Sequence, residues 1–556
     1  PAMVRGRRSR PAPHAIEMET LRGFPCLPAL RRRRAKPGFA TAVRQIWNAG
    51  LVLAVLAMPA LASAAEGTAE REIPRLGLSP GDPQVRSATP SVPFGIQPAE
   101  SKKANVLDFH GYMLMPAHLG LHERDPLSDA QSGTVLHSPP LMAQNLRSFE
   151  YTGVVPSPWL QMNFLYGNSS VYATAILVGT SAMDGSSYYN PVEQFGVNDA
   201  FITANLTKTF GFPFLLHVGA FTGRYGAMGA WDAGRYGTPL IARTNTIGET
   251  IVAGYKLGEV FFVLEQGLGG QFGRPPAGLV GAGWNNYANA DVGATFVNQV
   301  HLGIAYARLL RLGLHYMTAW TQDDLVRDGQ VPDGRITVLG ADVQVTAKRA
   351  GHLYLGGAFA KATNAGTVSG AIEILNARGG PELIANYLGN PAYLVDREAN
   401  PDKSGGNGSL STFGAQYDLS IARLVFGDLY QGLSPDILVS LFGVATYVTS
   451  RDEDRDGVLK LKGGAEATYL PLSWLGISER FDHVRLHGSD SKQAFNIISS
   501  RLLFHLDWKS RGELALQYSH FIYGVDVPVW SSYDPPLAKR VKPDHDVFSL
   551  MATYWW

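Results

Sequence analysis

The sequence predicts an all-β protein: a transmembrane antiparallel β-barrel of about 16–18 strands, with short periplasmic turns at one rim and long external loops at the other. Three observations lead to this prediction. The chain ends on an alternating, aromatic-rich strand; charged residues are scarce; and strand-length segments are separated by links that alternate between short and long.

The C-terminal strand alternates between two faces. Every second residue up to the end of the chain is apolar, whereas the opposite row is mixed; the apolar row is Phe548, Leu550, Ala552, Tyr554 and Trp556. An apolar face with terminal aromatics is typical of the closing strand of an outer-membrane barrel. A buried terminal strand of a soluble protein is the alternative interpretation.

The composition argues against an ordinary soluble enzyme. Charged residues make up 17% of the chain, below the roughly 25% that is usual for globular proteins. Glycine is abundant, with 61 residues, and the mean hydropathy of −0.03 is too low for a bundle of membrane helices. Scarce charge, many glycines and many aromatics suit the wall of a barrel.

The N-terminal residues 1–64 are interpreted as an extension and a signal peptide. The basic run Arg31–Arg34 precedes an apolar run over 49–61 and then Ala62-Ser63-Ala64, so cleavage is expected before Ala65. The only cysteine, Cys26, would be removed with this leader, which excludes disulfides and a thiol nucleophile from the mature chain.

Removal of the leader also changes the charge balance. Residues 65–556 hold 37 Lys and Arg against 45 Asp and Glu, a net charge of −8, so nucleic acid is not an expected partner. Residues 65–105 are rich in Pro, Ser and Gly and are predicted to be a flexible periplasmic arm. The barrel is expected to occupy residues 106–556.

Strand-length segments recur from Val106 to the end of the chain. Strands are predicted near 106–118, 158–167, 170–181, 193–206, 213–224, 245–257, 259–270, 291–307, 309–322, 335–347, 351–363, 408–421, 436–449, 458–471, 474–486, 494–507, 511–524 and 544–556. Long links are expected at 119–157, 225–244, 271–290, 364–407 and 525–543. An even number of strands would place both termini in the periplasm. The link 422–435 is long for a periplasmic turn, so it could hide a further strand.

Alternation within these segments assigns a lipid face and an inner face. In the strand over 494–507, the apolar row of Ile498, Leu502 and Leu506 opposes Arg501 and His505. Isolated charges opposite an apolar row are explained if one face meets lipid and the other meets water. A barrel of this size has a lumen too wide for side chains to fill, so the sequence predicts a diffusion path unless loops fold inward.

The first predicted strand resembles a known family. Its segment Val106-Leu107-Asp108-Phe109-His110-Gly111-Tyr112 is similar to the opening Asp-Phe-His-Gly-Tyr strand of the maltoporin (sugar-porin) family, whose members also commonly close on Trp-Trp, as here at Trp555-Trp556. The resemblance implies an eighteen-stranded homotrimer that passes saccharides. The roughly 400 residues between the two motifs match only in strand count and spacing.

The resemblance implies a role for Tyr112 in the pore. In the family this tyrosine belongs to a row of aromatics on which sugar rings slide, because an aromatic ring covers the apolar face of a pyranose. The family typically places an arginine two residues later, where this chain has Leu114, and the family's first-loop cysteines are missing. A tyrosine at the membrane interface or packed in the lumen is the alternative interpretation.

The segment 225–244 is the predicted constriction. It combines glycines with aromatics and both signs of charge, namely Tyr225, Trp231, Asp232, Arg235, Tyr236 and Arg243. A loop of this composition, folded inward, would narrow a pore and suit a sugar filter; an exposed surface loop is the alternative.

Other inward charges are mixed in sign, so weak ion selectivity or simple salt bridging within the wall is expected. These residues are Asp342, Glu466, Arg480, Asp482, Arg501, His505, Asp507 and Glu513.

The functional prediction is an outer-membrane porin of a Gram-negative bacterium, embedded in the lipid bilayer, that allows passive diffusion of small hydrophilic solutes, with saccharides favoured. A general or anion/organic-acid porin is the alternative, and an outer-membrane enzyme or adhesin is a third hypothesis. No catalytic motif occurs in the sequence, and neither a metal site nor a cofactor is expected.

Overall fold

The structure is a computed structural model. It describes residues 105–120, 159–180, 194–225, 242–272, 294–321 except 308, 334–365 except 348, 368, 372–375, 381–383, 406–430, 435–451, 456–485, 494–507, 511–523 and 544–555. The predicted signal peptide and nearly all of the predicted arm therefore lie outside the described residues.

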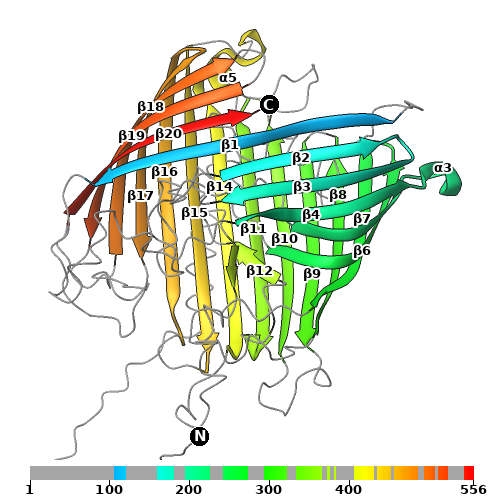
Figure 1. Cartoon of the computed structure of the whole chain (residues 1–556). Coiled ribbons are helices and arrows are strands. Elements are labelled where there is room, and N and C mark those ends of the chain that lie inside the picture. The colour runs from blue at the N-terminus through cyan, green and yellow to red at the C-terminus, as the bar shows by residue number, and fades with distance from the viewer. Residues whose placement is uncertain are drawn as a thin grey trace, which may run out of the picture.

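The strands form one antiparallel sheet (Figure 1). They are β1 (Val106–Gly120), β2 (Trp159–Gly167), β3 (Val171–Thr180), β4 (Gln194–Asn205), β5 (Phe214–Tyr225), β6 (Ala242–Leu257), β7 (Val260–Phe272), β8 (Ala294–Tyr306), β9 (Leu310–Thr321), β10 (Arg335–Ala347), β11 (Gly351–Thr363), β12 (Ile372–Leu375), β13 (Pro381–Leu383), β14 (Gly408–Ser420), β15 (Asp436–Ser450), β16 (Leu459–Leu472), β17 (Leu475–Arg485), β18 (Ala494–Asp507), β19 (Arg511–Tyr523) and β20 (Asp544–Trp555).

The sheet closes on itself. Each strand from β1 to β11 and from β14 to β20 pairs with its neighbour in the chain, β11 pairs with β14, and β1 pairs with both β2 and β20. The closing pairing aligns Tyr112 of β1 with Trp555 of β20. Of the 20 described strands, only β12 and β13 stand outside this ring, so the wall has eighteen strands, the upper limit of the predicted range. Closure leaves no unpaired edge, which lipid requires.

The links between strands alternate in length and define two rims. The short-turn rim consists of the links 168–170, 206–213, 258–259, 307–309, 348–350, 421–435, 473–474 and 508–510; the long-loop rim consists of 121–158, 181–193, 226–241, 273–293, 322–334, 364–407, 451–458, 486–493 and 524–543. Both ends of the barrel, Val106 and Trp555, lie at the short-turn rim. In outer-membrane barrels the short turns face the periplasm.

Two links of the short-turn rim contain helical turns. Helix α3 (Thr207–Phe210) lies between β4 and β5, while α5 (Ile421–Phe426) and the 3-10 helix η8 (Gly427–Leu429) lie between β14 and β15. In Figure 1, α3 projects at the right edge and α5 lies at the top. The long link at 422–435 is therefore explained by helical structure, and the strand considered there is not present in its described part.

The outward face is mainly apolar. Exposed large side chains recur at alternate positions, as in Phe548 and Leu550 of β20 and, on either side of the exposed Glu479, in Ile477 and Phe481 of β17. Inward-facing neighbours such as Ser478 and Ser549 are buried. This confirms the alternation predicted from the sequence.

Exposed tyrosines mark the short-turn end of this outward face. They lie within a few residues of that rim on five strands, as Tyr166, Tyr255, Tyr306, Tyr469 and Tyr554. A girdle of this kind marks a membrane–water interface. Within the described ranges, no helix has the length and apolar character needed to cross a bilayer.

Candidate functional site on the inner face

The inner face changes character along the barrel. On β9 and β10 it is apolar near the long-loop rim: Met317 and Ala319 of β9 and Ile336 and Val338 of β10 are at most 2% exposed. Farther along the same strands it becomes polar, with His315 on β9 and, on β10, Asp342 and Gln344. On these two strands the inner wall thus has an apolar zone next to the long loops and a polar zone beyond it.

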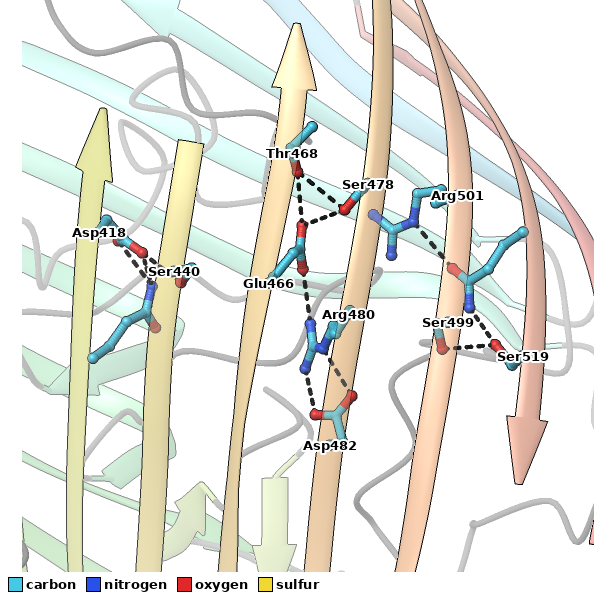
Figure 2. Close-up of polar contacts among 12 residues, drawn as sticks. Asp418, Ser440, Glu466, Thr468, Ser478, Arg480, Asp482, Ser499, Arg501 and Ser519 are labelled. Atoms are coloured by element: carbon cyan, nitrogen blue, oxygen red, sulfur yellow. Dashed lines mark hydrogen bonds and ion pairs between the residues drawn. The ribbon is translucent and has the colours of Figure 1, made fainter. Parts of the chain in front are cut away.

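Strands β16 and β17 carry the main charged cluster, with Arg480 at its centre (Figure 2). Its guanidinium donates two hydrogen bonds to Asp482, from Nε at 2.8 Å and from Nη2 at 2.9 Å, and a third from Nη1 to Glu466 at 3.2 Å. The guanidinium carbon also lies 4.5 Å from the centre of the Phe442 ring. Register explains the cluster, because Glu466 and Arg480 are direct partners of the β16–β17 pair.

Hydroxyl groups extend this cluster toward the short-turn rim. The Oγ1 of Thr468 donates to the Oγ of Ser478 at 3.0 Å, and Ser478 donates to Glu466 at 3.3 Å. These three groups lie on facing positions of β16 and β17, as Figure 2 shows.

A second network crosses β18 and β19. Arg501 donates from Nε to Gln517 at 3.1 Å, and Gln517 donates to Ser519 at 2.8 Å. Ser519 and Ser499 are 2.9 Å apart through their hydroxyl oxygens, and these residues are at most 4% exposed. On β14 and β15, Asp418 accepts hydrogen bonds from Gln416 and Ser440 (Figure 2).

Charges of the polar zone are largely compensated within the wall. Arg480 bridges two carboxylates, His315 contacts Asp342, and the Nδ1 of His505 lies 3.5 Å from Glu513. His315 also stacks on His301, with ring centres 4.6 Å apart. Of the predicted inward charges, only Asp507 has a side chain outside the described residues. The described wall therefore presents no ring of one sign.

The hairpin of β12 and β13 reaches across the inner side of the barrel. β12 pairs with β6, aligning Ile372 with Thr244 and Glu373 with Arg243, although β7 to β10 separate β6 from β11 in the ring. The segment starts on the inner side, because Ala365 and Val368 pack in one buried cluster with inward-facing residues such as Val338. The link 364–407, predicted as a plain long loop, thus contains an inward-folded hairpin.

The contact with β6 lies beside a buried polar pair. Thr244 is fully buried, and its Oγ1 donates to the Oε1 of Gln299 on β8 at 2.5 Å. Gln299 is itself inward-facing and 2% exposed. The hairpin is therefore attached where the β5–β6 loop ends and β6 enters the wall.

The predicted site residues are only partly placed. The backbones of Tyr112, Tyr225 and Arg243 lie on β1, at the end of β5 and at the start of β6, and their side chains are outside the described set. Trp231, Asp232, Arg235 and Tyr236 lie wholly outside the described residues. The structure brings Arg243 to the hairpin contact, and it does not test the other five as constriction residues.

Sequence reasoning missed the hairpin and the pairing around Arg480. The signal for the first was weak: Ile372-Glu373-Ile374-Leu375 is a short β-prone run inside a long link. The second depends on a register shift between Tyr469 and Leu472: alignment about the turn alone would place Glu466 opposite Phe481, whereas the shifted register places it opposite Arg480. Among the described residues, no group of His, Cys, Asp or Glu could hold a metal ion.

A closed antiparallel ring with an apolar exterior, an aromatic girdle and a polar inner zone defines a transmembrane β-barrel of the outer-membrane type. No family model matches the chain, and no curated protein does.

Solved structures resemble it only distantly. OccK11 (OpdR) of Pseudomonas aeruginosa is 12% identical with a TM-score of 0.34, and the match covers 81% of this chain and 95% of that one. OmpT of Vibrio cholerae is 11% identical with a TM-score of 0.33, covering 83% and 100%. The outer membrane channel DcaP of Acinetobacter baumannii is 9% identical with a TM-score of 0.32, covering 83% and 100%.

Proposed function

We propose that the protein is a porin that lets small hydrophilic solutes diffuse passively across the outer membrane. The single observation that carries the proposal is the closed eighteen-strand ring, apolar outside and polar on a large part of its inner face. A ring of this size encloses more space than side chains from its own wall can fill. The inward-folded hairpin then restricts the size of the solutes that enter.

Neutral solutes, and saccharides in particular, are the substrate class that we favour. Because Arg480 is bonded to Glu466 and Asp482 and His315 contacts Asp342, charges of the inner wall are paired locally and form no ring of one sign among the described residues. Polar inner-face groups that keep some exposure, such as Glu466 and His505, can exchange hydrogen bonds with sugar hydroxyls in place of water. The opening motif ending at Tyr112 supports the same class by resemblance.

A porin for anions or organic acids is the second candidate. The observation behind it is the guanidinium of Arg501 on the inner face, whose Nε donates to Gln517 at 3.1 Å. We also propose that the protein has no enzymatic activity, since the polar groups of the described wall are arranged as structural pairs. A homotrimer is proposed from the resemblance alone.

Liposome swelling and planar-bilayer recording test this proposal. We expect liposomes that contain the protein to swell in sucrose and in short maltodextrins, at rates that fall with solute size. We also expect a reversal potential near zero in a salt gradient. Swelling limited to organic anions, with a strongly anion-selective reversal potential, would favour the second candidate. Absence of both swelling and conductance would refute transport altogether. Electrophoresis of unheated and heated samples tests the trimer.

A further inference from the structure

The link that contains helix α3 carries an exposed aromatic cluster at the short-turn rim. Phe210 is 50% exposed and Phe212 is 40% exposed. The ring centres of Phe210 and Phe214 are 4.6 Å apart, and those of Phe212 and Phe214 are 6.0 Å apart. We call Phe210, Phe212 and Phe214 the rim aromatic cluster. Large exposed aromatics are costly in water, so their grouping at one link needs a physical reason.

The cluster is continuous with the lipid-facing surface. Phe214 is the first residue of β5 and pairs with Ala253 of β6, on the same face as the exposed Val218 and Tyr255. Tyr255 belongs to the girdle that marks the interface at this rim. Phe210 at the end of α3 and Phe212 just after it thus extend the outward apolar face past the end of the strand, at the level where headgroups begin.

The turn is held in place by its own hydrogen bonds. The Oδ1 of Asn205 accepts a hydrogen bond from the backbone N–H of Thr207 at 3.1 Å. The Oγ1 of Thr207 accepts one from the backbone N–H of Phe214 at 3.2 Å. Gly211, with φ of 78°, ends the helix and donates to the carbonyl of Thr207 at 2.9 Å. The aromatics are therefore presented by a fixed turn, which lowers the entropy lost when they bind a surface.

The charge of the turn fits a phospholipid surface. α3 contains Lys208, which is exposed, and no acidic residue in its first turn. Aromatic rings at the headgroup boundary beside a lysine that can reach lipid phosphate are the usual chemistry of an interfacial anchor. The turn 168–170 of the same rim, Asn-Ser-Ser, has no such side chains.

We propose that α3 and the rim aromatic cluster form an anchor that inserts into the headgroup region of the periplasmic phospholipid leaflet. The other helical link of this rim carries the same kind of surface, with Val425, Phe426 and Leu429 exposed. The anchor depends on the barrel lying in a membrane and is independent of which solute, if any, the barrel passes.

A fluorescent label at Thr209 tests the anchor, because Thr209 is exposed and its replacement leaves all three phenylalanines intact. Thr209→Cys is made in a Cys26→Ser background, labelled with a small fluorophore and reconstituted in phosphatidylcholine vesicles with phosphatidylglycerol. Ser170→Cys serves as the water-exposed control on the same rim, and Leu264→Cys as the lipid-facing control. Quenching is measured with iodide and with a lipid that carries its quencher just below the headgroup.

We expect the label at position 209 to be quenched strongly by the lipid quencher and weakly by iodide, and the label at position 170 to behave in the opposite way. Phe210→Ser together with Phe212→Ser should return position 209 to iodide access; Phe212→Ser alone serves if the double variant does not assemble. If iodide quenched the label at position 209 while all three phenylalanines were present, the proposal would be overturned. Protection from both quenchers would also overturn it, because it would indicate that another copy of the protein covers the cluster.

Discussion

Arg243 of β6 and Glu373 of β12 are direct partners in an antiparallel pairing that ties a loop hairpin to the barrel wall. Glu373 belongs to the long link 364–407 that follows β11, and four strands separate β11 from β6 within the ring. The pairing therefore fixes a part of the chain across the inner side of the barrel, where it can limit what enters.

Cross-linking tests this pairing. Register partners have Cα atoms about 4.5–5.5 Å apart, within the range that a disulfide bridges. Arg243→Cys with Glu373→Cys, in a Cys26→Ser background, should form an internal disulfide on oxidation, detected as a reducible change in electrophoretic mobility. The matched control is Thr246→Cys with Glu373→Cys, about 10 Å out of register. Equal cross-linking of both pairs would contradict the register.

Removal of the hairpin should widen the path. Replacing residues 372–383 with a short Gly-Ser linker is expected to raise the single-channel conductance and to admit larger sugars in the swelling assay. The ring itself should persist, because β11 and β14 pair directly over their length. Unchanged conductance in a correctly assembled variant would show that the hairpin does not restrict the path.

The wall of this barrel was predictable because its physics is local. Two-residue alternation assigns Phe548 to lipid and Ser549 to the inside without knowledge of any distant contact. The hairpin was not predictable in the same way, since pairing Glu373 with Arg243 depends on the curvature of the whole ring, which no local pattern encodes. The helical link after Ser420 was hidden for a different reason: its caps, Ser420 and Asp436, are recognisable only once the two strands are side by side.

Arg480 is expected to be important for both stability and selectivity. In Arg480→Gln, Glu466 and Asp482 lose their shared counter-charge while Asp482 stays buried, so the free energy of unfolding should fall by about 3–5 kcal/mol. The uncompensated carboxylates should also move the reversal potential toward cation selectivity. Urea titration in vesicles and a salt-gradient recording measure the two effects.

The double variant Arg480→Gln/Asp482→Asn is the control for this prediction. It removes one negative charge together with the positive one, so it should recover much of the lost stability and selectivity. A double variant no better than the single one would show that the charge pairing is not the cause.

Gly464 and Gly463 provide a matched pair on one strand. A Cβ at Gly464 would lie 2.4 Å from the carbonyl oxygen of Phe481 and 2.5 Å from the ring of Phe442, whereas a Cβ at Gly463 meets only one atom, at 3.4 Å. Gly464→Ala should therefore lower the free energy of unfolding by roughly 1–3 kcal/mol, as overpacking does, and should displace the ring below Arg480. Gly463→Ala should change it by less than about 0.5 kcal/mol. Equal effects would contradict the packing around Phe442.

Phe481 tests whether the outward face meets lipid. Its side chain is exposed, and a surface substitution in water changes stability by only about 0.5 kcal/mol. If the face lies in the bilayer, Phe481→Arg should lower the free energy of unfolding in vesicles by up to about 2–4 kcal/mol, depending on depth, while Phe481→Leu should be nearly neutral. If Phe481→Arg left the free energy of unfolding unchanged, the result would show that this surface lies in water.

Conductance of the purified protein in a planar lipid bilayer tests the central claim most directly. A closed ring with an apolar exterior and a water-filled path through it should insert and give discrete, ohmic current steps that decrease reversibly when sucrose or a maltodextrin is added. A protein that inserts, verified by the mobility difference between unheated and heated samples, and yet gives no current steps would contradict the account.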